Sequence, residues 1–440
     1  MPDTPPNPAG LAVPSSRIAR MARLGRVTAG VAGNMAVGGL GQLGRGQRPD
    51  MRALLLTPRN MTRVADELAK MRGAAMKMGQ LMSMDTGDVF PPELSQIMAR
   101  LRDDAHVMPP KQLKSVLNAQ WGDGWLRHFK RFDVRPVAAA SIGQVHRAQT
   151  KDGRDLAIKV QYPGVARSID SDVSNVGALI KMTGLLPKGF GLGPYLEEAK
   201  AQLHAETDYA AEGRALQRFG ALLDGDARFV VPVMDAEFSG PQILAMEYIE
   251  SVPIEDMAEA PQDLRDTIAH DMIDLMLREL FSFGLMQTDP NFANYRYRRD
   301  TGQIVLLDFG ATRALGPDVG ATYRAIMRAG LDTDRAGLER AALDIGFISE
   351  DVAARHRERI LDMMGLVFSA LTAKAAYEFT DTALSQQMQA QGIALAEDGF
   401  IPPPLPMDAL FLQRKFAGMF LLAARLRARV PVIAMIRSWL

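Results

Sequence analysis

The chain of 440 residues, 47% of them hydrophobic, is long enough for two or three globular domains with real cores. Its 51 Lys and Arg residues balance its 51 Asp and Glu residues, so the overall charge gives no reason to expect a nucleic-acid partner. The absence of cysteine excludes disulfides, thiolate metal sites and a cysteine nucleophile, and the six histidines form no HExxH-like pair, which argues against zinc chemistry.

The first 50 residues are expected to form a flexible, Gly-rich segment. Residues 1–15 are rich in Pro and lack the apolar run of a secretory signal, so we predict disorder and do not expect secretion. The uncharged run Val27–Gly44 has two interpretations, a flexible segment or a membrane-associating helix. The Arg-containing, acid-poor stretch 16–30 is compatible with a transit peptide.

A helical extension is predicted over residues 51–125, because apolar residues recur there at helical spacing. Within it, "KMGQ" places Lys77 and Gln80 on one helix face. Gly79 between them costs a helix about 1 kcal/mol relative to alanine, and such a glycine often marks the close approach of another group. Without further context, Lys77 would be interpreted as a solvated lysine.

Residues 126–250 are predicted to form a small β-rich unit with one long helix. From Phe129 onward the sequence runs in short alternating segments, and "KDGR" at 151–154 indicates a hairpin. The long helix is predicted over Leu196–Leu222. Two more strands, in "RFVVPVMDAEF" and "QILAMEYIE", are expected to follow it.

Residues 251–440 are predicted to be mostly helical, with one strand in "GQIVLLDFG" that runs into a loop. The C-terminal segment from residue 416 interrupts its apolar runs with arginines, and none of these runs is long enough to span a bilayer. This segment is either a helix packed on the core of its unit or an amphipathic surface that binds anionic lipid.

Three polar residues around this strand have the spacing of a phosphoryl-transfer site. Asp289 is followed five positions later by Asn294, which is the D-x-x-x-x-N spacing of a kinase-type catalytic loop, and Asp308 opens an Asp-Phe-Gly run. Asp308 and Asn294 offer hard oxygen ligands for Mg²⁺, whereas Asp289 is placed to orient or deprotonate an attacking hydroxyl or water. The alternative for Asp289, which precedes a proline, is a turn or cap residue.

Residues earlier and later in the chain supply the other parts of a nucleotide site. Lys159, in the strand-like "LAIKV", is a point charge suited to the α- and β-phosphates of ATP, although taken alone it could be an exposed strand lysine. The run "LAMEYIE" resembles a hinge, with Met246 as gatekeeper and backbone groups of Glu247 and Ile249 facing an adenine edge. Each signal is weak alone, but the order and spacing of all of them fit one architecture.

The turn "AAASIGQV" before Lys159 aligns with the pattern G-x-G-x-x-G-x-V, with two changes. Ala138 and Ala140 stand where the first two glycines are expected. Because alanine disfavours positive φ and adds a methyl group, this Ala-rich loop is predicted to be stiffer than a Gly-rich one. The loop residues expected to contact the nucleotide are Ala138, Ala139, Ala140, Ser141, Ile142, Gly143 and Val145.

From about Met71 to Ala314 the chain resembles the UbiB/ADCK family of atypical kinase-like proteins, also called AarF-domain proteins. The resemblance rests on "KMGQ", "AAASIGQV", "AIKVQYPGV", "ETDY", "QTDPNFAN" and "DFG", and "QTDPN" is most similar to the ubiquinone-biosynthesis branch. It implies an α+β, protein-kinase-like two-lobed fold with a helical N-terminal extension laid over the active site. The N-lobe would then be 126–250 and the C-lobe 251–440.

The resemblance also assigns a regulatory role to the extension and to the acidic motif that faces it. The residues concerned are Lys77, Gln80, Glu206 and Asp208. Glu212, one turn beyond Asp208, is expected to partner Lys159, and the sequence leaves Glu206 open as the alternative partner. In the family, the Ala-rich loop goes with altered nucleotide preference and suppressed kinase behaviour.

One departure from ordinary protein kinases limits the expected substrates. Thr288 replaces the arginine that commonly precedes the catalytic aspartate, and no APE motif follows Gly310. A platform that docks a peptide substrate is therefore not expected.

Together with the site residues, the resemblance implies an atypical kinase-like ATPase that supports ubiquinone biosynthesis, with Mg-ATP bound between the lobes and chemistry at Asp289 and Lys159. The expected partners are membrane lipids or prenylated quinone precursors and quinone-biosynthesis proteins. We expect it at the membrane surface of a cytoplasmic or mitochondrial-matrix-like compartment. The alternatives are a phosphotransferase acting on a protein or a small molecule, and a nucleotide-gated lipid or complex scaffold.

Overall fold

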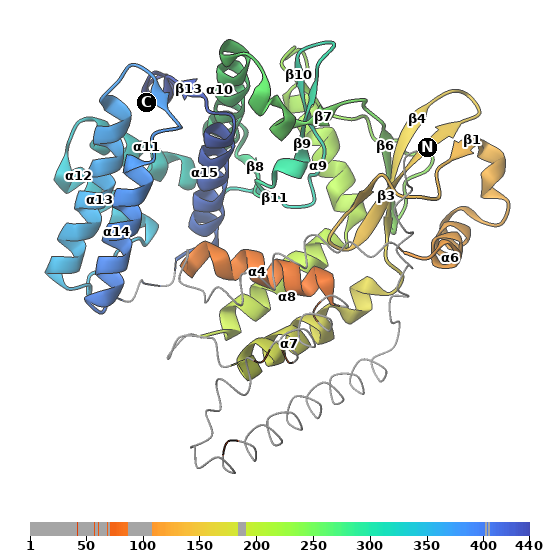
Figure 1. Cartoon of the computed structure of the whole chain (residues 1–440), viewed down its shortest axis with the longest axis horizontal. Helices are drawn as coiled ribbons and strands as arrows, with labels where there is room; N and C mark the ends of the chain where they lie inside the picture. The colour runs from red at the N-terminus through yellow and green to blue at the C-terminus, as the bar shows by residue number, and fades with distance from the viewer. Residues whose placement is uncertain are drawn as a thin grey trace. The chain divides into compact units, whose positions relative to one another are not determined.

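The computed structural model describes residues 71–86, 108–183, 191–400, 403 and 405–440, and a few isolated positions before residue 71. The chain divides into two compact units (Figure 1). The first unit comprises Met1–Arg214 and Val233–Tyr248, and the second comprises Ala215–Pro232 and Ile249–Leu440. The expected flexible segment 1–50, with the run Val27–Gly44, lies outside the described residues apart from Gln42.

The first unit contains a five-stranded antiparallel sheet with the order β1-β3-β4-β6, and with β2 paired to β3. Its strands are β1 (Phe129–Phe132), β2 (Ala138–Ala139), β3 (Gly143–Thr150), β4 (Asp155–Gln161) and β6 (Ile243–Glu247). The predicted hairpin at 151–154 is confirmed, because β3 and β4 pair across it and Gly153 has the positive φ of 99° that glycine adopts without strain. Lys159 lies in β4, opposite Val145 of β3 and Leu244 of β6.

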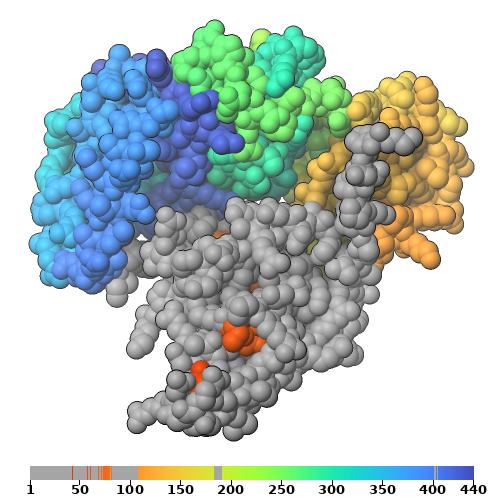
Figure 2. Space-filling model, in the orientation of Figure 1, coloured from red at the N-terminus to blue at the C-terminus, as the bar shows by residue number. Residues whose placement is uncertain are grey.

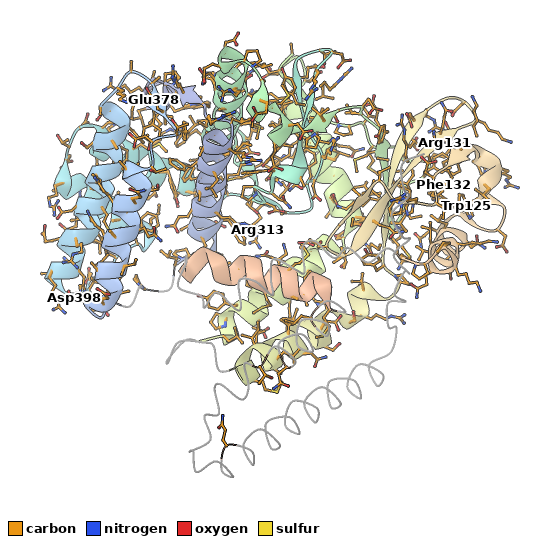
Figure 3. All side chains as sticks on the ribbon, in the orientation of Figure 1. Trp125, Arg131, Phe132, Arg313, Glu378 and Asp398 are labelled. Carbon is orange, nitrogen blue, oxygen red and sulfur yellow. The ribbon has the colours of Figure 1, made fainter. Side chains whose placement is uncertain are left out.

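An aromatic cluster joins the sheet to α6 (Pro110–Trp121) and the short η2 (Trp125–His128). Trp125 meets Phe132 edge to face with ring centroids 4.9 Å apart, and Figure 3 labels both rings beside β1. Phe129 and Phe238 lie closer still, at 4.7 Å. Trp121 of α6 joins the same cluster, with its ring centroid 5.5 Å from that of Phe129. Aromatic pairs of this kind contribute about 0.5–1.5 kcal/mol each beyond their buried area, so the cluster fixes α6 against the strands.

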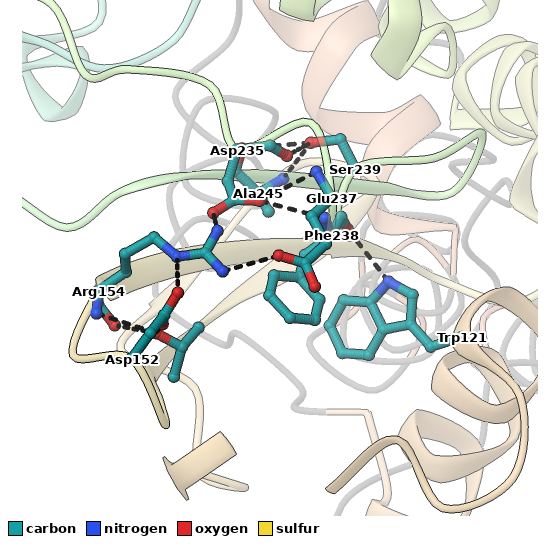
Figure 4. A network of polar contacts seen from close by, with 9 residues as sticks. Trp121, Asp152, Arg154, Asp235, Glu237, Phe238, Ser239 and Ala245 are labelled. Carbon is teal, nitrogen blue, oxygen red and sulfur yellow. Dashed lines mark hydrogen bonds and ion pairs between the residues drawn. The ribbon is translucent and has the colours of Figure 1, made fainter. Parts of the chain in front are cut away.

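Arg154 connects the β3–β4 hairpin to the segment before β6 (Figure 4). Its guanidinium forms ion pairs with the carboxylates of Asp152, Asp235 and Glu237. The backbone of that segment is held by α6 as well, since Trp121 Nε1 donates to the Phe238 carbonyl over 3.1 Å. These contacts hold β6, which leads to the expected hinge, in register with the sheet.

The predicted single helix over Leu196–Leu222 is wrong, because the chain forms two helices there. In the described part of this unit the other helices are α4 (Arg72–Thr86), α7 (Val165–Thr183), α8 (Gly193–Glu206) and the first part of α9 (Tyr209–Leu222). Between α8 and α9, the Thr207 hydroxyl donates to the His204 carbonyl over 2.7 Å and the Asp208 carboxylate accepts from the Ala211 N–H over 2.8 Å. Such local side-chain bonds compete with helical ones and start a new helix at this point.

The second unit contains more strands than the one predicted from its sequence. They are β5 (Phe229–Val230), β7 (Val252–Pro253), β8 (Leu285–Gln287), β9 (Tyr295–Arg298), β10 (Gln303–Leu306), β11 (Thr312–Ala314), β12 (Tyr377–Glu378) and β13 (Arg429–Val430). They pair as a sheet of order β5-β10-β9-β7 and as the two-stranded pairs β8–β11 and β12–β13. Within residues 251–440 only β10 was predicted, because strands of two to four residues are too short to show a period. The strand expected in "RFVVPVMDAEF" is likewise reduced to β5, which ends before Pro232.

Helices form the rest of the second unit, and the space-filling view shows the late ones in blue as a closely packed body (Figure 2). They are η3 (Ile254–Glu259), α10 (Gln262–Arg278), η4 (Glu279–Phe283), η5 (Phe292–Asn294), α11 (Val319–Leu331), α12 (Arg335–Ile345), α13 (Ala354–Thr372), α14 (Ala383–Glu397), α15 (Met407–Arg425) and α16 (Val432–Arg437). At the C-terminus, α15 and α16 bury apolar side chains in the unit, and Trp439 packs its ring 5.8 Å from that of Phe281. This packing favours the core interpretation of the C-terminal segment. None of the helices in the described ranges is both long and apolar enough to cross a bilayer.

Candidate functional site

Lys159 is held by a carboxylate within the first unit. It lies on β4, and its Nζ is 2.7 Å from Oε1 of Glu212 in the first turn of α9. The two residues are 8% and 4% exposed, so the ion pair is nearly buried. The ammonium group also lies 5.2 Å from the ring centre of Tyr209, a cation–π distance. The structure therefore resolves the open choice between Glu206 and Glu212 in favour of Glu212.

Glu206 binds the helical extension instead. Its carboxylate forms an ion pair with Nζ of Lys77 on α4, and it also accepts a hydrogen bond from the hydroxyl of Ser141 in the Ala-rich loop. Lys77 is only 5% exposed, so its interpretation as a solvated lysine is wrong. Asp208 caps α9 rather than pairing with the described part of the extension, and the side chain of Gln80 lies outside the described atoms. One carboxylate thus connects the extension to the loop expected to hold nucleotide.

The Ala-rich loop is a tight turn, since the Ala140 N–H donates to the Gly143 carbonyl over 2.9 Å. At the start of the loop, Ala138 of β2 pairs with Val145 of β3. Gly143 is required by packing, because a Cβ there would lie 2.4 Å from the Val160 carbonyl oxygen. The close approach of β3 and β4 explains this glycine without any ligand, and contact between the loop and nucleotide stays a prediction.

The expected hinge lies where β6 ends. Met246 is buried and Glu247 after it is exposed. The N–H of Glu247 donates to the Val233 carbonyl over 2.8 Å, so an adenine edge would have to meet the carbonyl group of Glu247. The Ile249 carbonyl accepts from the Ser251 hydroxyl over 3.0 Å, so its N–H is the group that stays a candidate for adenine.

Asp289 and Asn294 lie together on the loop between β8 and β9 of the second unit. Nδ2 of Asn294 donates to the Asp289 carbonyl over 3.1 Å and lies 3.4 Å from its carboxylate. The other carboxylate oxygen of Asp289 is 2.6 Å from the NH2 group of Arg414 on α15. The structure places Asp289 at the centre of a polar cluster, and this arginine was not among the predicted site residues.

Asp308 and Asn294 fit a magnesium ion that is held mainly through phosphate. One carboxylate oxygen of Asp308 accepts a hydrogen bond from the Gly310 N–H over 3.0 Å. The side-chain nitrogen of Asn294 donates to Asp289, so its amide oxygen is the atom suited to a cation. Mg²⁺ is usually held by one or two such oxygens together with phosphate and water. Across the described ranges, no group of three or more His, Asp or Glu residues could hold a metal alone.

Gln287, the last residue of β8, connects this loop to a buried ion pair. Its side-chain amide donates to the carbonyls of Asp289 and Asp308, over 2.8 and 3.2 Å. Lys415 on α15 donates to the Gln287 carbonyl over 2.9 Å, and its Nζ lies 3.1 Å from Oε2 of Glu279. Lys415 and Glu279 are each 1% exposed. A buried pair thus fixes the backbone that presents both aspartates.

Burial is the largest influence on the pKa of each member of this pair. It raises the pKa of Glu279, and the charge of Lys415 opposes this only in part. Burial alone would lower the pKa of Lys415, but the Glu279 carboxylate and the Tyr295 hydroxyl raise it above its ordinary value. Lys415 therefore stays protonated at neutral pH. The signal that sequence analysis missed was "QRKFAG", two adjacent cations inside an otherwise apolar helix.

Known proteins are similar to this chain in sequence and in fold. Residues 100–342 match the ABC1 atypical kinase-like domain. The chain is 37% identical over 422 residues to atypical kinase COQ8, mitochondrial, of Saccharomyces cerevisiae, across 95% of this chain and 83% of that protein. It is 34% identical over 425 residues to atypical kinase COQ8B, mitochondrial, of Danio rerio, across 95% of this chain and 67% of that protein. Among solved structures, the Rv3197–erythromycin complex of Mycobacterium tuberculosis has a similar fold, with a TM-score of 0.59 at 24% identity over 81% of this chain and 89% of that one.

Proposed function

Because this chain belongs to the ABC1 atypical kinase-like family, we propose that it binds Mg-ATP through Lys159, Asn294 and Asp308 and cleaves it with the help of Asp289. It is an ATP-dependent enzyme with the kinase-like α+β fold, and it supports ubiquinone biosynthesis. Its relatives carry the word mitochondrial in their names, and we place this chain in a mitochondrial-matrix-like or cytoplasmic compartment, peripheral to the membrane.

The proposed mechanism assigns one task to each side chain. Lys159, held by Glu212, binds the α- and β-phosphates as a fixed positive charge. Asn294 and Asp308 would hold Mg²⁺, which when bound neutralises charge on the phosphates. Asp289 accepts a hydrogen bond from the attacking water or hydroxyl and takes its proton as the γ-phosphoryl group is transferred.

The buried Lys159–Glu212 pair is the single observation that carries this proposal. A buried ion pair is a poor means of stabilising a fold, because the cost of removing two charges from water offsets most of their attraction. A strand lysine kept in such a pair is better explained by an anionic ligand that it must meet at a fixed position. Nucleotide phosphate is the anion that the rest of the cluster supports.

Hydrolysis, rather than phosphorylation of a protein, is the reaction we favour. Glu206 ties the extension to the Ala-rich loop through Lys77 and Ser141, and Thr288 uses its hydroxyl to bind the Ala311 carbonyl over 2.8 Å, where an ordinary kinase has an arginine. Both features restrict the loop rearrangements that peptide kinases use. The second candidate is transfer to a small acceptor, and the third is a nucleotide-gated scaffold for lipids or prenylated quinone precursors without turnover.

The proposal is tested by phosphate release from Mg-ATP, for wild type and Asp289→Asn, with and without vesicles containing anionic lipid. We expect release that vesicles stimulate and that the variant loses by about 100-fold or more, as for the removal of a catalytic acid–base group. Phosphate found on an added acceptor instead of in solution would favour the second candidate. ATP binding with no release under any condition would contradict catalysis and favour the scaffold.

A further inference from the structure

One face of α15 is pressed against the loop that carries Asp289. Arg414 binds the Asp289 carboxylate over 2.6 Å, and the next residue, Lys415, donates to the Gln287 carbonyl over 2.9 Å. One turn further, Gly418 lies so close to Pro290 that a Cβ on the glycine would be 2.3 Å from Cβ of the proline. The helix and the loop therefore meet at three neighbouring points, which fixes the backbone of Arg414 relative to the loop.

The loop itself supplies no positive charge. From Thr288 to Asn294 the sequence is Thr-Asp-Pro-Asn-Phe-Ala-Asn, without lysine or arginine. Phosphoryl transfer develops charge on the phosphoryl oxygens and needs cations placed beside them. Arg414, which lies 125 positions after Asp289 in the sequence, brings a guanidinium group to within hydrogen-bond distance of the catalytic carboxylate.

Among the described residues, Arg414 uses little of its donor capacity. A guanidinium has five N–H donors, and within the described residues only the NH2 group makes a hydrogen bond, to Asp289. The side chain is 13% exposed, so a small anion can reach it while most water is excluded. Charge-assisted bonds are strongest in such partly shielded positions, and the planar fork of arginine suits phosphate better than the point charge of lysine.

We propose that Arg414 contacts the γ-phosphate of ATP and stabilises the transferred phosphoryl group. This rests on the proposed function of Asp289. An attacking oxygen lies about 3 Å from its base and about 3 Å from the phosphorus, so a group bound to Asp289 is within side-chain reach of the phosphoryl oxygens. The attacking oxygen gives its proton to Asp289 and forms a bond to the γ-phosphorus, while the bond to the β-phosphate oxygen breaks and leaves ADP. Arg414 keeps its protons throughout.

The test compares Arg414→Gln and Arg414→Lys with Arg425→Gln, which changes an exposed arginine at the end of the same helix. Dissociation constants for Mg-ATP and Mg-ADP and the single-turnover rate of phosphate release are measured for each. For Arg414→Gln we expect ATP to bind about ten-fold more weakly with ADP binding unchanged, and release to fall about 100-fold. Arg414→Lys should fall between wild type and Gln, and Arg425→Gln should match wild type.

An unchanged ratio of ATP to ADP affinity in Arg414→Gln, or faster release, would overturn the proposal, since the arginine would then only restrain Asp289. If that variant fails to fold, as judged by its melting temperature, Arg414→Lys decides, and wild-type values for its affinity ratio and rate would overturn the proposal. A wild type that binds ATP without releasing phosphate would refute the hydrolytic function. The affinity ratio would still test Arg414 in that case.

Discussion

Packing requires a glycine at position 143 but not at the positions of Ala138 and Ala140, although all three align with glycines of one phosphate-loop pattern. A Cβ at Gly143 would overlap the Val160 carbonyl and lie 3.0 Å from the Tyr209 hydroxyl. At Ala138 and Ala140 no such demand exists. In the described part of the chain, the only residues other than glycine with positive φ are Thr333 and Arg427, so neither alanine is strained. The two alanines therefore occupy this loop without backbone strain.

Gly143→Ala should destabilise the protein by about 1–3 kcal/mol, as expected when a methyl group is forced into a packed site. Ala140→Gly should cost only about 0.5–1 kcal/mol, through the greater freedom of the unfolded chain, and it should change the preference for ADP over ATP. Urea denaturation and nucleotide titrations measure the two effects. Gly193→Ala is the control, because a Cβ there meets nothing within 4 Å. Equal nucleotide affinities in Ala140→Gly and wild type would contradict the role of loop stiffness.

His146 makes the stability of the first unit depend on pH. Its ring is fully buried and stacked on Phe132, with Nδ1 2.8 Å from the Asp133 carbonyl and Nε2 2.8 Å from the Gln144 amide nitrogen. These partners suit the neutral ring with its proton on Nδ1. Burial lowers the pKa of His146 below its ordinary value, and the Asp133 carbonyl opposes this only in part.

Since the unfolded chain then binds a proton at higher pH than the folded one, stability should fall as pH drops below about 6.5, the ordinary histidine value. His146→Gln should remove this acid dependence between pH 7.5 and 5.5, whatever its effect at pH 7.5. The free energy of unfolding at several pH values measures the slope. His128→Gln, which changes an exposed histidine, should keep the wild-type slope, and an unchanged slope in His146→Gln would show that another group is responsible.

At the scale of elements, α15 is the part of the site that could least be predicted from sequence patterns. The strand and loop signals around Asp289 and Asp308 were readable because their spacing is local. The contribution of α15 depends on tertiary packing across more than a hundred residues, and its two cations lie within an apolar stretch that fits ordinary core packing. Figure 3 also shows Arg313, from the strand after Asp308, and its guanidinium carbon lies 4.0 Å from the ring centre of Phe411 on the same helix.

Breaking the buried pair between Lys415 on α15 and Glu279 on η4 should destabilise the protein more than replacing both residues. Lys415→Met leaves Glu279 buried without its cation and should destabilise the second unit by about 3–5 kcal/mol, whereas Lys415→Met with Glu279→Leu should recover most of that loss. A double-mutant cycle by denaturation measures the coupling. Phosphate release in the double variant should remain below the wild-type rate, because the Gln287 carbonyl loses its hydrogen bond from Lys415. Additive destabilisation by the two changes would show that the pair does not act as a unit.

On the scale of the whole chain, sequence reasoning identified the order of the site residues but not their partners. Lys159, Asp289, Asn294 and Asp308 could be named because each is part of a short motif. The choice of Glu212 over Glu206 could not be made, because both follow the same helical pattern and only the break between α8 and α9 separates their directions. The break arises from two hydrogen bonds whose energies are too small to be read from composition.

The division of these site residues between two compact units leads to a thermodynamic prediction. Lys159 and Glu212 belong to the first unit, and Asp289, Asn294 and Asp308 belong to the second. Under the proposed function, a nucleotide that needs residues of both is released when either unit unfolds, so it should oppose the unfolding of the less stable unit by about 2.7 kcal/mol at 100 times its dissociation constant. In calorimetry, Mg-ATP should therefore raise the temperature of the first transition, whichever unit unfolds in it. His146→Gln and Lys415→Met assign the transitions, because each change lies in the interior of one unit.

The control is Lys159→Met in the same experiment. It should abolish the nucleotide-induced rise even where the second unit unfolds first, although the substitution lies in the first unit alone, because the nucleotide no longer binds. Mg²⁺ without nucleotide should leave the transitions unchanged, since the metal is held mainly through phosphate. If the second unit unfolds first and the nucleotide leaves its transition unchanged while it raises that of the first unit, Asp289, Asn294 and Asp308 take no part in binding, and the assignment of the metal site is wrong.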